Sequence, residues 1–223
     1  MEYLRVVWTL FRKDLRAEWR SREMLSSMLV FALLAIILFV FSFELSADLH
    51  RQAFAGTLWI SLCFAGTLGL TRSFAQEQEN SVVEGLLLVP VDRSAIFFAK
   101  ALANWLWMML LAVLLVPLMA FFMNLNPFSW SLLGVILLGT LGYALCGTFL
   151  AGITSRLRHR ENFLPLLLFP VLLPLLLAVV RATGILLNGG DSAELITWLG
   201  MLAGYDMLFI ALGLFLFEQV IAD

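Results

Sequence analysis

The sequence has few charged residues for its length, and few cysteines and histidines. Of its 223 residues, 13% are charged and 62% are hydrophobic, and the mean hydropathy is +0.96. Soluble globular domains usually contain about 25% charged and about 45–50% apolar residues. Because so few polar side chains cannot cover the surface of a soluble globule, we expect an integral membrane protein.

Sequence motifs of the common catalytic and metal sites are also missing. The only lysines, Lys13 and Lys100, follow Arg12 and Ala99, so no phosphate-binding loop of the Gly-x-x-x-x-Gly-Lys-Ser/Thr type exists. There is no Gly-x-Ser-x-Gly, His-Glu-x-x-His or Cys-x-x-Cys either. We therefore expect no enzyme activity, no catalytic residue, no metal site and no directly bound cofactor. The two cysteines, Cys63 and Cys146, fall within predicted spans and are interpreted as small packing residues.

Long apolar runs without alternation predict membrane-spanning helices rather than the strands of a β-barrel. We expect an all-α, polytopic membrane protein with a single domain over 1–223 and six transmembrane helices. No small-residue cleavage site follows the first run, so we expect no removable signal peptide. The expected elements are an interfacial helix at 1–23, spans at 25–43, 53–71, 95–123, 130–154, 163–182 and 205–221, a cytosolic segment at 72–94, and a periplasmic or re-entrant segment at 188–204.

Residues 2–22 have the pattern of an amphipathic helix. At about 100° per residue, one arc carries apolar side chains and basic residues lie beside it; the apolar members are Leu4, Val7, Trp8, Phe11, Leu15 and Trp19. Such a helix lies flat in the headgroup layer, the alternative being a cytosolic helix packed on a partner protein. Glu18 falls inside the apolar arc, which weakens the pattern unless its carboxylate has a partner.

The cytosolic segment 72–94 holds the densest group of acidic residues. Ser81 and Glu84 fit the capping box, in which the two side chains satisfy backbone donors at a helix start, and Pro90 ends the helix near Leu88. A short helix with leucines framed by carboxylates at a membrane surface favours docking to another protein, and an ordinary solvated loop is the alternative. The residues expected to form the docking surface are Arg72, Phe74, Glu77, Glu79, Ser81, Glu84, Leu86, Leu87 and Pro90.

Prolines and small residues distinguish the third, fourth and fifth spans. Asp92 or Ser94 is expected to cap the third span, and Pro117 to kink it. The fourth span carries small residues at four-residue intervals, which lets neighbouring helices approach closely; these are Thr140, Ala144, Thr148 and Gly152, with Gly147 and Ala151 alongside. The fifth span contains three prolines, which we expect to make it a conformational hinge together with Pro117; they are Pro165, Pro170 and Pro174.

The last third of the chain allows two placements of the sixth span. If the span runs over 197–217, Asp206 lies at the bilayer midplane, where an ionisable group is a functional hypothesis by default. If it runs over 205–221, Asp206 is only its N-cap and 188–204 is a separate amphipathic or re-entrant segment. We favour the second placement because it exposes the carboxylate to water, and we keep Asp206 as a possible polar site.

The cations predict the orientation. Twelve of the 14 lysines and arginines fall before the first span, in the segment between the second and third spans or at the start of the third span, or in the basic turn Arg156–Arg160. The other two, Arg51 and Arg181, fall on the opposite side. Because cytoplasmic loops carry the excess of positive charge, we expect both termini in the cytoplasm.

Several stretches are similar to a known family. They include Phe11-Arg12-Lys13-Asp14-Leu15-Arg16, Leu58-Trp59, Arg72-Ser73-Phe74, Glu84-Gly85-Leu86-Leu87-Leu88, Gly147-Thr148 and Phe163-Leu164-Pro165-Leu166-Leu167-Leu168-Phe169-Pro170. With six spans and a docking helix, the chain resembles membrane subunits of ABC exporters of the ABC-2 type, whose ATPase is a separate chain. Within that class it is similar to the haem exporter protein B (CcmB) family of the cytochrome c maturation system.

The resemblance implies a permease subunit in the bacterial inner membrane that works as a homodimer with a CcmA-like ATPase. It also implies CcmC-like and CcmD-like haem-handling membrane subunits and a CcmE-like periplasmic haem chaperone, whose release ATP hydrolysis drives. ATP and haem would then be bound by these partners, and the segment 72–94 would be the ATPase-coupling segment. The alternatives are a permease for drugs, lipids or polysaccharides, and a membrane scaffold that transports nothing.

Overall fold

The computed structural model describes residues 2–42, 47–79, 92–154 and 160–217. Within these ranges the chain is helical and contains no strand, which confirms the all-α prediction. Six helices are long and apolar enough to cross a membrane, so the chain is a multi-pass membrane protein. The helices are α1 (Glu2–Ser21), α2 (Glu23–Ser42), α3 (Ala47–Glu79), α5 (Arg93–Met123), α6 (Trp130–Thr154), α7 (Arg160–Asn188) and α8 (Ser192–Phe215).

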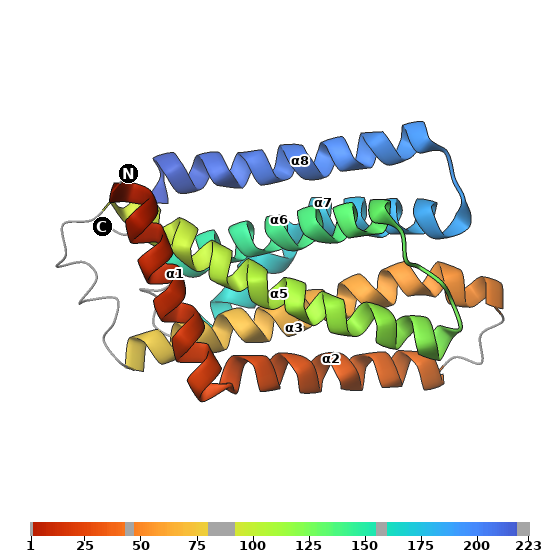
Figure 1. Ribbon diagram of the computed structural model, residues 1–223, viewed down its shortest axis with the longest axis horizontal. Helices are drawn as coiled ribbons and strands as arrows, with labels where there is room; N and C mark the ends of the chain where they lie inside the picture. Colours follow the sequence, from red (N-terminus) through yellow and green to blue (C-terminus); the bar gives the residue numbers. More distant parts are fainter. Residues whose placement is uncertain (1, 43–46, 80–91, 155–159, 218–223) are drawn as a thin grey trace.

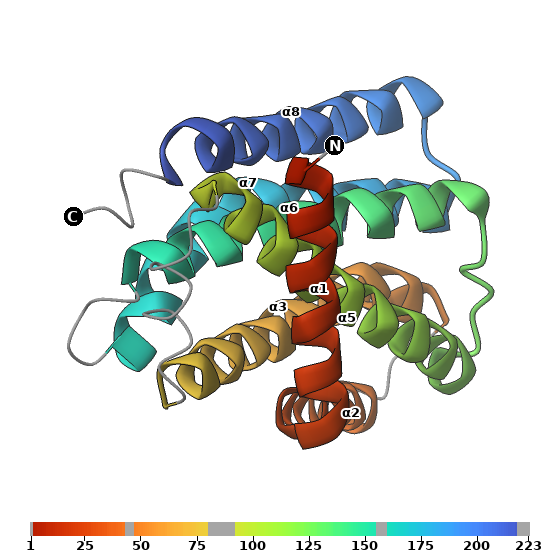
Figure 2. The same ribbon diagram turned by 60° about the vertical axis from the view of Figure 1, so that its left-hand side comes forward.

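The six long helices run up and down side by side, and α1 lies across one end of the bundle in front of α5 (Figures 1 and 2). The helix α6 lies at the centre, because it packs against α3, α5, α7 and α8. The outer helices α2 and α8 bury only 22% and 17% of their spanning windows, compared with 72% for α3 and α6. The faces of α2 and α8 that point away from the bundle are apolar, as contact with lipid requires.

Local signals set several helix ends, of which the cap of α5 at Asp92 was predicted from the sequence. Asp92 is the N-cap of α5, and its carboxylate accepts a hydrogen bond from the Ser94 N–H at 2.9 Å. Asn124 ends the same helix in the left-handed conformation, with φ of 50°. Asp191 caps α8 in the same way as Asp92 caps α5. The fourth span coincides with its predicted range, Trp130–Thr154.

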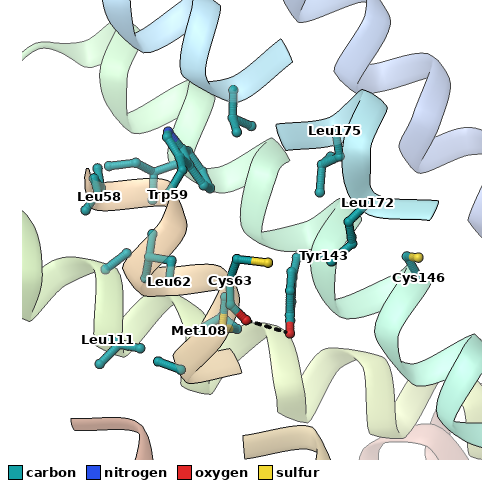
Figure 3. Packing of buried hydrophobic residues seen from close by; sticks show 14 of the residues in the cluster. Leu58, Trp59, Leu62, Cys63, Met108, Leu111, Tyr143, Cys146, Leu172 and Leu175 are labelled. Atoms are coloured by element: carbon teal, nitrogen blue, oxygen red, sulfur yellow. Dashed lines mark hydrogen bonds between the residues drawn. The ribbon is translucent and has the colours of Figure 1, made fainter. Parts of the chain in front are cut away.

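Gly139 and Gly147 of α6 let neighbouring helices approach its backbone. A side chain at Gly139 would collide with Trp59 of α3 and Val179 of α7, and one at Gly147 would collide with Leu70 of α3. Figure 3 shows the buried side chains of α3, α5, α6 and α7 meeting around this region, with Cys63 and Cys146 among them as free, buried thiols. Small residues on α6 therefore do bring the helices together, as their spacing predicts.

The bounds expected for the second helix are too narrow. The helix α3 runs over Ala47–Glu79, whereas its span was expected at 53–71, so residues 47–52 and 72–79 are helical as well. The apolar run marks where the chain crosses the hydrocarbon, but a helix continues through polar residues at both membrane surfaces because its backbone hydrogen bonds do not depend on side-chain polarity.

The preferred placement of the sixth span is also wrong. The helix α8 is continuous over Ser192–Phe215, so residues 192–204 belong to the span and do not form a separate segment, and Asp206 lies within the helix instead of capping it. The capped, uninterrupted apolar stretch from Ser192 stabilises one long helix, whereas a start at Tyr205 would expose backbone groups within the membrane.

The cations are separated between the two ends of the bundle. Because successive helices alternate in direction, α1, the end of α3 and the start of α5 share one end (Figure 1). Arg51 near the start of α3 and Arg181 near the end of α7 lie towards the opposite end. The two-sided distribution inferred from the sequence is therefore present in the fold.

Candidate functional site

The predicted docking surface falls only partly within the described residues. Arg72 is exposed on α3, and Phe74, Glu77 and Glu79 lie in the last turns of that helix. Outside the described residues lie Ser81, Glu84, Leu86, Leu87 and Pro90, so the predicted short helix at 81–88 stays a prediction. The helix α3 thus extends eight residues beyond the predicted end of its span at Thr71, and two glutamates of the predicted docking surface fall within its last turns.

The other flank of this segment is tied to the interfacial helix. Besides the hydrogen bond from the Ser94 N–H, the Asp92 carboxylate accepts one from the Ser94 hydroxyl at 2.7 Å. The Ser94 hydroxyl also lies 2.9 Å from the Tyr3 hydroxyl, a hydrogen bond between the start of α5 and the start of α1. Residue 92 is therefore linked by hydrogen bonds to the first turns of both α5 and α1.

The interfacial helix α1 turns into α2 through a tight polar junction. Arg22 adopts φ of 57°, in the left-handed region, and this single residue separates the end of α1 from the start of α2. Glu18 is 6% exposed, and its Oε1 accepts the N–H of Leu25 at 2.9 Å in the first turn of α2. Burial raises the pKa of the Glu18 carboxyl above its usual range, and the backbone N–H groups of Leu25 and Met24 oppose that shift. The partner that the sequence required for Glu18 is thus the backbone of the following helix.

The proline positions of the predicted hinge lie inside helices. Pro117 is within α5, and Pro165, Pro170 and Pro174 are within the continuous helix α7. Each removes one backbone N–H from the helix ladder, which leaves a carbonyl one turn earlier without its donor. Close to Pro174, the last of these prolines, the Tyr205 hydroxyl donates a hydrogen bond to the Val171 carbonyl at 3.1 Å, which joins α8 to α7. Bending of α7 during function stays a prediction.

Asp206 lies in the middle of the seam by which α8 packs onto the bundle. The buried residues of α8 are Leu202, Asp206, Phe209 and Gly213, and this spacing puts all four on one face. Asp206 is 3% exposed, and neither of its carboxylate oxygens has a hydrogen-bond partner among the described residues. Burying a carboxylate without a partner is costly, and within a span it marks a functional site by default.

The carboxylate of Asp206 is held against the backbone of α6. A Cβ at Gly142 would collide with Oδ1 of Asp206 and would lie 2.7 Å from Leu175 Cδ1 of α7. Gly142 is therefore the residue that makes room for Asp206 at the meeting point of α6, α7 and α8. The sequence identified Asp206 as a candidate, but it gave no signal that Gly142 would be its neighbour.

Buried hydrogen bonds between helices were missed by reasoning from the sequence, and three of them join different pairs of helices. The Trp59 indole donates to the Thr183 hydroxyl at 2.9 Å, joining α3 to α7. The Asn104 amide donates to the Thr148 hydroxyl at 2.9 Å, joining α5 to α6. The Tyr143 hydroxyl donates to the Cys63 carbonyl at 3.1 Å, joining α6 to α3 (Figure 3). A polar side chain inside an apolar run could have predicted these bonds, because such a side chain usually forms a hydrogen bond with a polar group of a neighbouring helix.

Within the described ranges, no group of three histidine, cysteine, aspartate or glutamate side chains is placed to hold a metal ion. The site is therefore described by its two parts: the flanks of the segment 80–91, and the buried carboxylate of Asp206 between α6 and α8.

Comparison with known proteins assigns the chain to a family. A family model described as CcmB protein matches residues 5–222. The chain is 30% identical over 204 residues to "Heme exporter protein B" of Rhodobacter capsulatus, covering 91% of this chain and 92% of that protein. It is 29% identical over 194 residues to the protein of that name from Pseudomonas aeruginosa, with 86% and 87% covered, and 28% identical over 205 residues to that from Paracoccus denitrificans, with 91% and 92% covered. Because the family model spans nearly the whole chain, this protein belongs to the CcmB family.

Proposed function

We propose that this chain is the membrane (permease) subunit of an ABC transporter complex in cytochrome c maturation. In this proposal a separate, CcmA-like subunit hydrolyses ATP, and the membrane subunit couples that hydrolysis to haem handling and to release of the haem-loaded, CcmE-like chaperone. The observation that carries the proposal is membership of the CcmB family over residues 5–222, together with relatives named heme exporter protein B.

The location and partners follow from the same argument. The chain lies in the bacterial inner membrane with both termini in the cytoplasm, because the cation-rich end of the bundle is expected on the cytoplasmic side. It works as a homodimer beside CcmC-like and CcmD-like haem-handling subunits. ATP is bound by the ATPase subunit and haem by the partner subunits, so this chain binds neither directly.

The coupling segment provides the contact with the ATPase. Glu77, Glu79 and Glu84 pair with basic residues of the ATPase, while Leu86 and Leu87 fill an apolar groove. Support comes from the flanks: α3 continues as a helix to Glu79, and the chain returns at the capped residue Asp92, which is linked to both α5 and α1. Closure of the ATPase on nucleotide would then displace α3, α5 and α1 together, with the proline-containing helix α7 as the compliant element.

The direct test is the double substitution Glu84→Arg and Leu86→Asp in the detergent-solubilised complex. It reverses one charge and places another in the expected apolar contact, so we expect loss of ATPase co-purification. Partner-dependent ATP turnover should fall at least tenfold, since two interface contacts of about 1 kcal/mol or more each are removed. Co-purified proteins are identified by mass spectrometry.

Glu194→Arg is the matched control, because Glu194 is an exposed glutamate in the first turn of α8 at the opposite end of the bundle. It should leave ATPase recovery unchanged. Unchanged recovery and turnover in the double variant would place the docking surface elsewhere. Recovery of an ATPase without a haem chaperone would instead favour a permease with another substrate, and recovery of no ATPase from the wild-type chain would favour a scaffold.

A further inference from the structure

An apolar groove runs between the interfacial helix α1 and the spanning helix α5. It has a volume of about 640 Å³, and its walls include Leu15 and Trp19 from α1 and Leu106, Leu110 and Val113 from α5. Arg16 is the one charged residue in its lining. A groove with apolar walls and a single cation at its edge matches a ligand with a long apolar part and one anionic group.

The groove opens towards the bilayer rather than towards water. Leu106, Leu110 and Val113 are 42%, 39% and 56% exposed on a helix that is long and apolar enough to span the membrane. From Leu106 to Val113 the helix rises about 10 Å, roughly a third of the hydrocarbon thickness. A groove of that length can hold the upper part of an acyl chain of one leaflet.

The cation at the groove lies at the level of lipid headgroups. The helix α1 crosses the end of the bundle at which α2 begins, and α5 continues beyond it towards the other end (Figure 1). Trp19, which is 67% exposed, is a residue type that settles at the boundary between hydrocarbon and headgroups. Arg16 is therefore placed where a lipid phosphate lies when the acyl chain of that lipid occupies the groove.

The edge of α1 beside the groove is positively charged. Arg12, Arg16 and Arg20 recur at four-residue intervals, so they follow one another along one edge of the helix, and all three are exposed. The two acidic side chains described on α1 do not neutralise this edge: Asp14 pairs with Lys13 at 3.0 Å, and Glu18 is buried against the start of α2. A row of arginines next to an apolar groove attracts anionic lipid in preference to zwitterionic lipid.

We propose that this groove is a binding site for one anionic phospholipid, with an acyl chain along Leu106, Leu110 and Val113 and its phosphate at Arg16. The lipid fixes α1 against α5 in the headgroup layer.

The test uses the full-length chain in mild detergent and in phosphatidylcholine nanodiscs with and without phosphatidylglycerol. Native mass spectrometry counts the phospholipids that stay bound, and the headgroup is identified from the mass. For the wild type we expect one retained phosphatidylglycerol. Arg16→Gln should lower the preference for phosphatidylglycerol over phosphatidylcholine about fivefold, the effect of one basic side chain near a lipid surface. Leu110→Trp should fill the groove and remove retention of either lipid.

Matched controls separate the site from general effects. Arg51→Gln removes a cation at the opposite end of the bundle, and Val30→Trp adds the same bulk at a 57% exposed position of α2 outside the groove. Both should retain the lipid as the wild type does. A second measurement needs no variant: short-chain phosphatidylglycerol should raise the melting temperature of the delipidated wild type more than short-chain phosphatidylcholine at equal concentration.

Three results would overturn the proposal. One is equal retention by the wild type, Arg16→Gln and Leu110→Trp. Another is retention without preference for an anionic headgroup, which would show only ordinary annular lipid. The third is a dimer that Leu110→Trp dissociates and lipid does not affect, which would assign the groove to a second copy of the chain.

Discussion

Glu18 and Asp206 are the two buried carboxylates among the described residues, and their surroundings differ. Glu18, at the junction of α1 and α2, accepts a backbone hydrogen bond from Leu25. Asp206, between α8 and α6, has no partner for either oxygen. The Glu18 carboxylate helps to fix the angle between α1 and α2, which is a structural role. The burial of the Asp206 carboxylate destabilises the folded chain, and no hydrogen bond of this carboxylate to a described residue offsets that loss. The comparison therefore directs functional interest to Asp206 rather than to Glu18.

The largest effect is expected from closing the space around Asp206. Gly142→Leu would force Asp206 and Leu175 away from α6 and separate α8 from the bundle, because the added side chain meets both at once. We expect a loss of about 2–3 kcal/mol in the free energy of unfolding in detergent, the usual cost of overpacking a well-packed core.

Gly134→Leu on the same helix is the matched control, since a Cβ there meets nothing within 4 Å. Its effect should stay within about 0.5 kcal/mol. Equal losses in the two variants would mean that leucine is poorly tolerated anywhere on α6, and that the close approach of Asp206 to Gly142 has no special weight.

A smaller effect of opposite sign is expected from Asp206→Asn. The substitution keeps the shape of the side chain and removes the buried carboxylate, so we expect a gain of about 1–2 kcal/mol in the free energy of unfolding at neutral pH. If Asp206 serves function, partner-dependent ATP turnover should fall in the same variant, because functional sites are maintained at the expense of stability.

Glu18→Ala sharpens the comparison, because its expected effect has the opposite sign. It should lower the free energy of unfolding by about 1 kcal/mol, since the Leu25 N–H is left without its acceptor. Chemical denaturation of both variants in the same detergent gives the sign of the change in the free energy of unfolding for each. A loss of stability in Asp206→Asn would show that the carboxylate contributes to folding and would remove the contrast between the two sites.

The smallest effect is expected from the pH dependence of Glu18→Gln. Burial raises the pKa of Glu18 in the folded chain, so the folded state binds the proton more tightly than the unfolded state. Wild-type stability should therefore fall as pH rises from the ordinary glutamate value of about 4.3 through the raised pKa. The glutamine variant keeps an acceptor for Leu25 and does not titrate.

The advantage of Glu18→Gln over the wild type should thus be least at low pH, grow as pH rises, and level off above the raised pKa. Melting temperatures of the two chains, measured across pH in one detergent, give this difference curve. Any contribution of Asp206 to the pH dependence cancels in the difference, because both chains contain it. A wild-type advantage that grows with pH would mean that the two backbone hydrogen bonds to Glu18 outweigh its burial.

Much of the candidate site follows from short-range signals. The cap at Asp92 and the small-residue face of α6 depend on residues close in sequence, and they are present in the structure. The need of Glu18 for a partner was also visible, because a carboxylate interrupted an apolar arc. The identity of that partner, the N–H of Leu25, depends on the left-handed turn at Arg22, which no local pattern predicts.

The sequence by itself determined the number and order of the spans and the separation of the cations. The reason is that the hydrocarbon core demands an apolar helix of fixed minimum length wherever the chain crosses it. Only the tertiary structure decided that Asp206 is buried, that it contacts Gly142 and that a groove lies beside Arg16. Hydropathy describes the solvent that each residue prefers. The burial of a polar group inside a span depends instead on which helices pack around it, and those contacts join residues far apart in the chain.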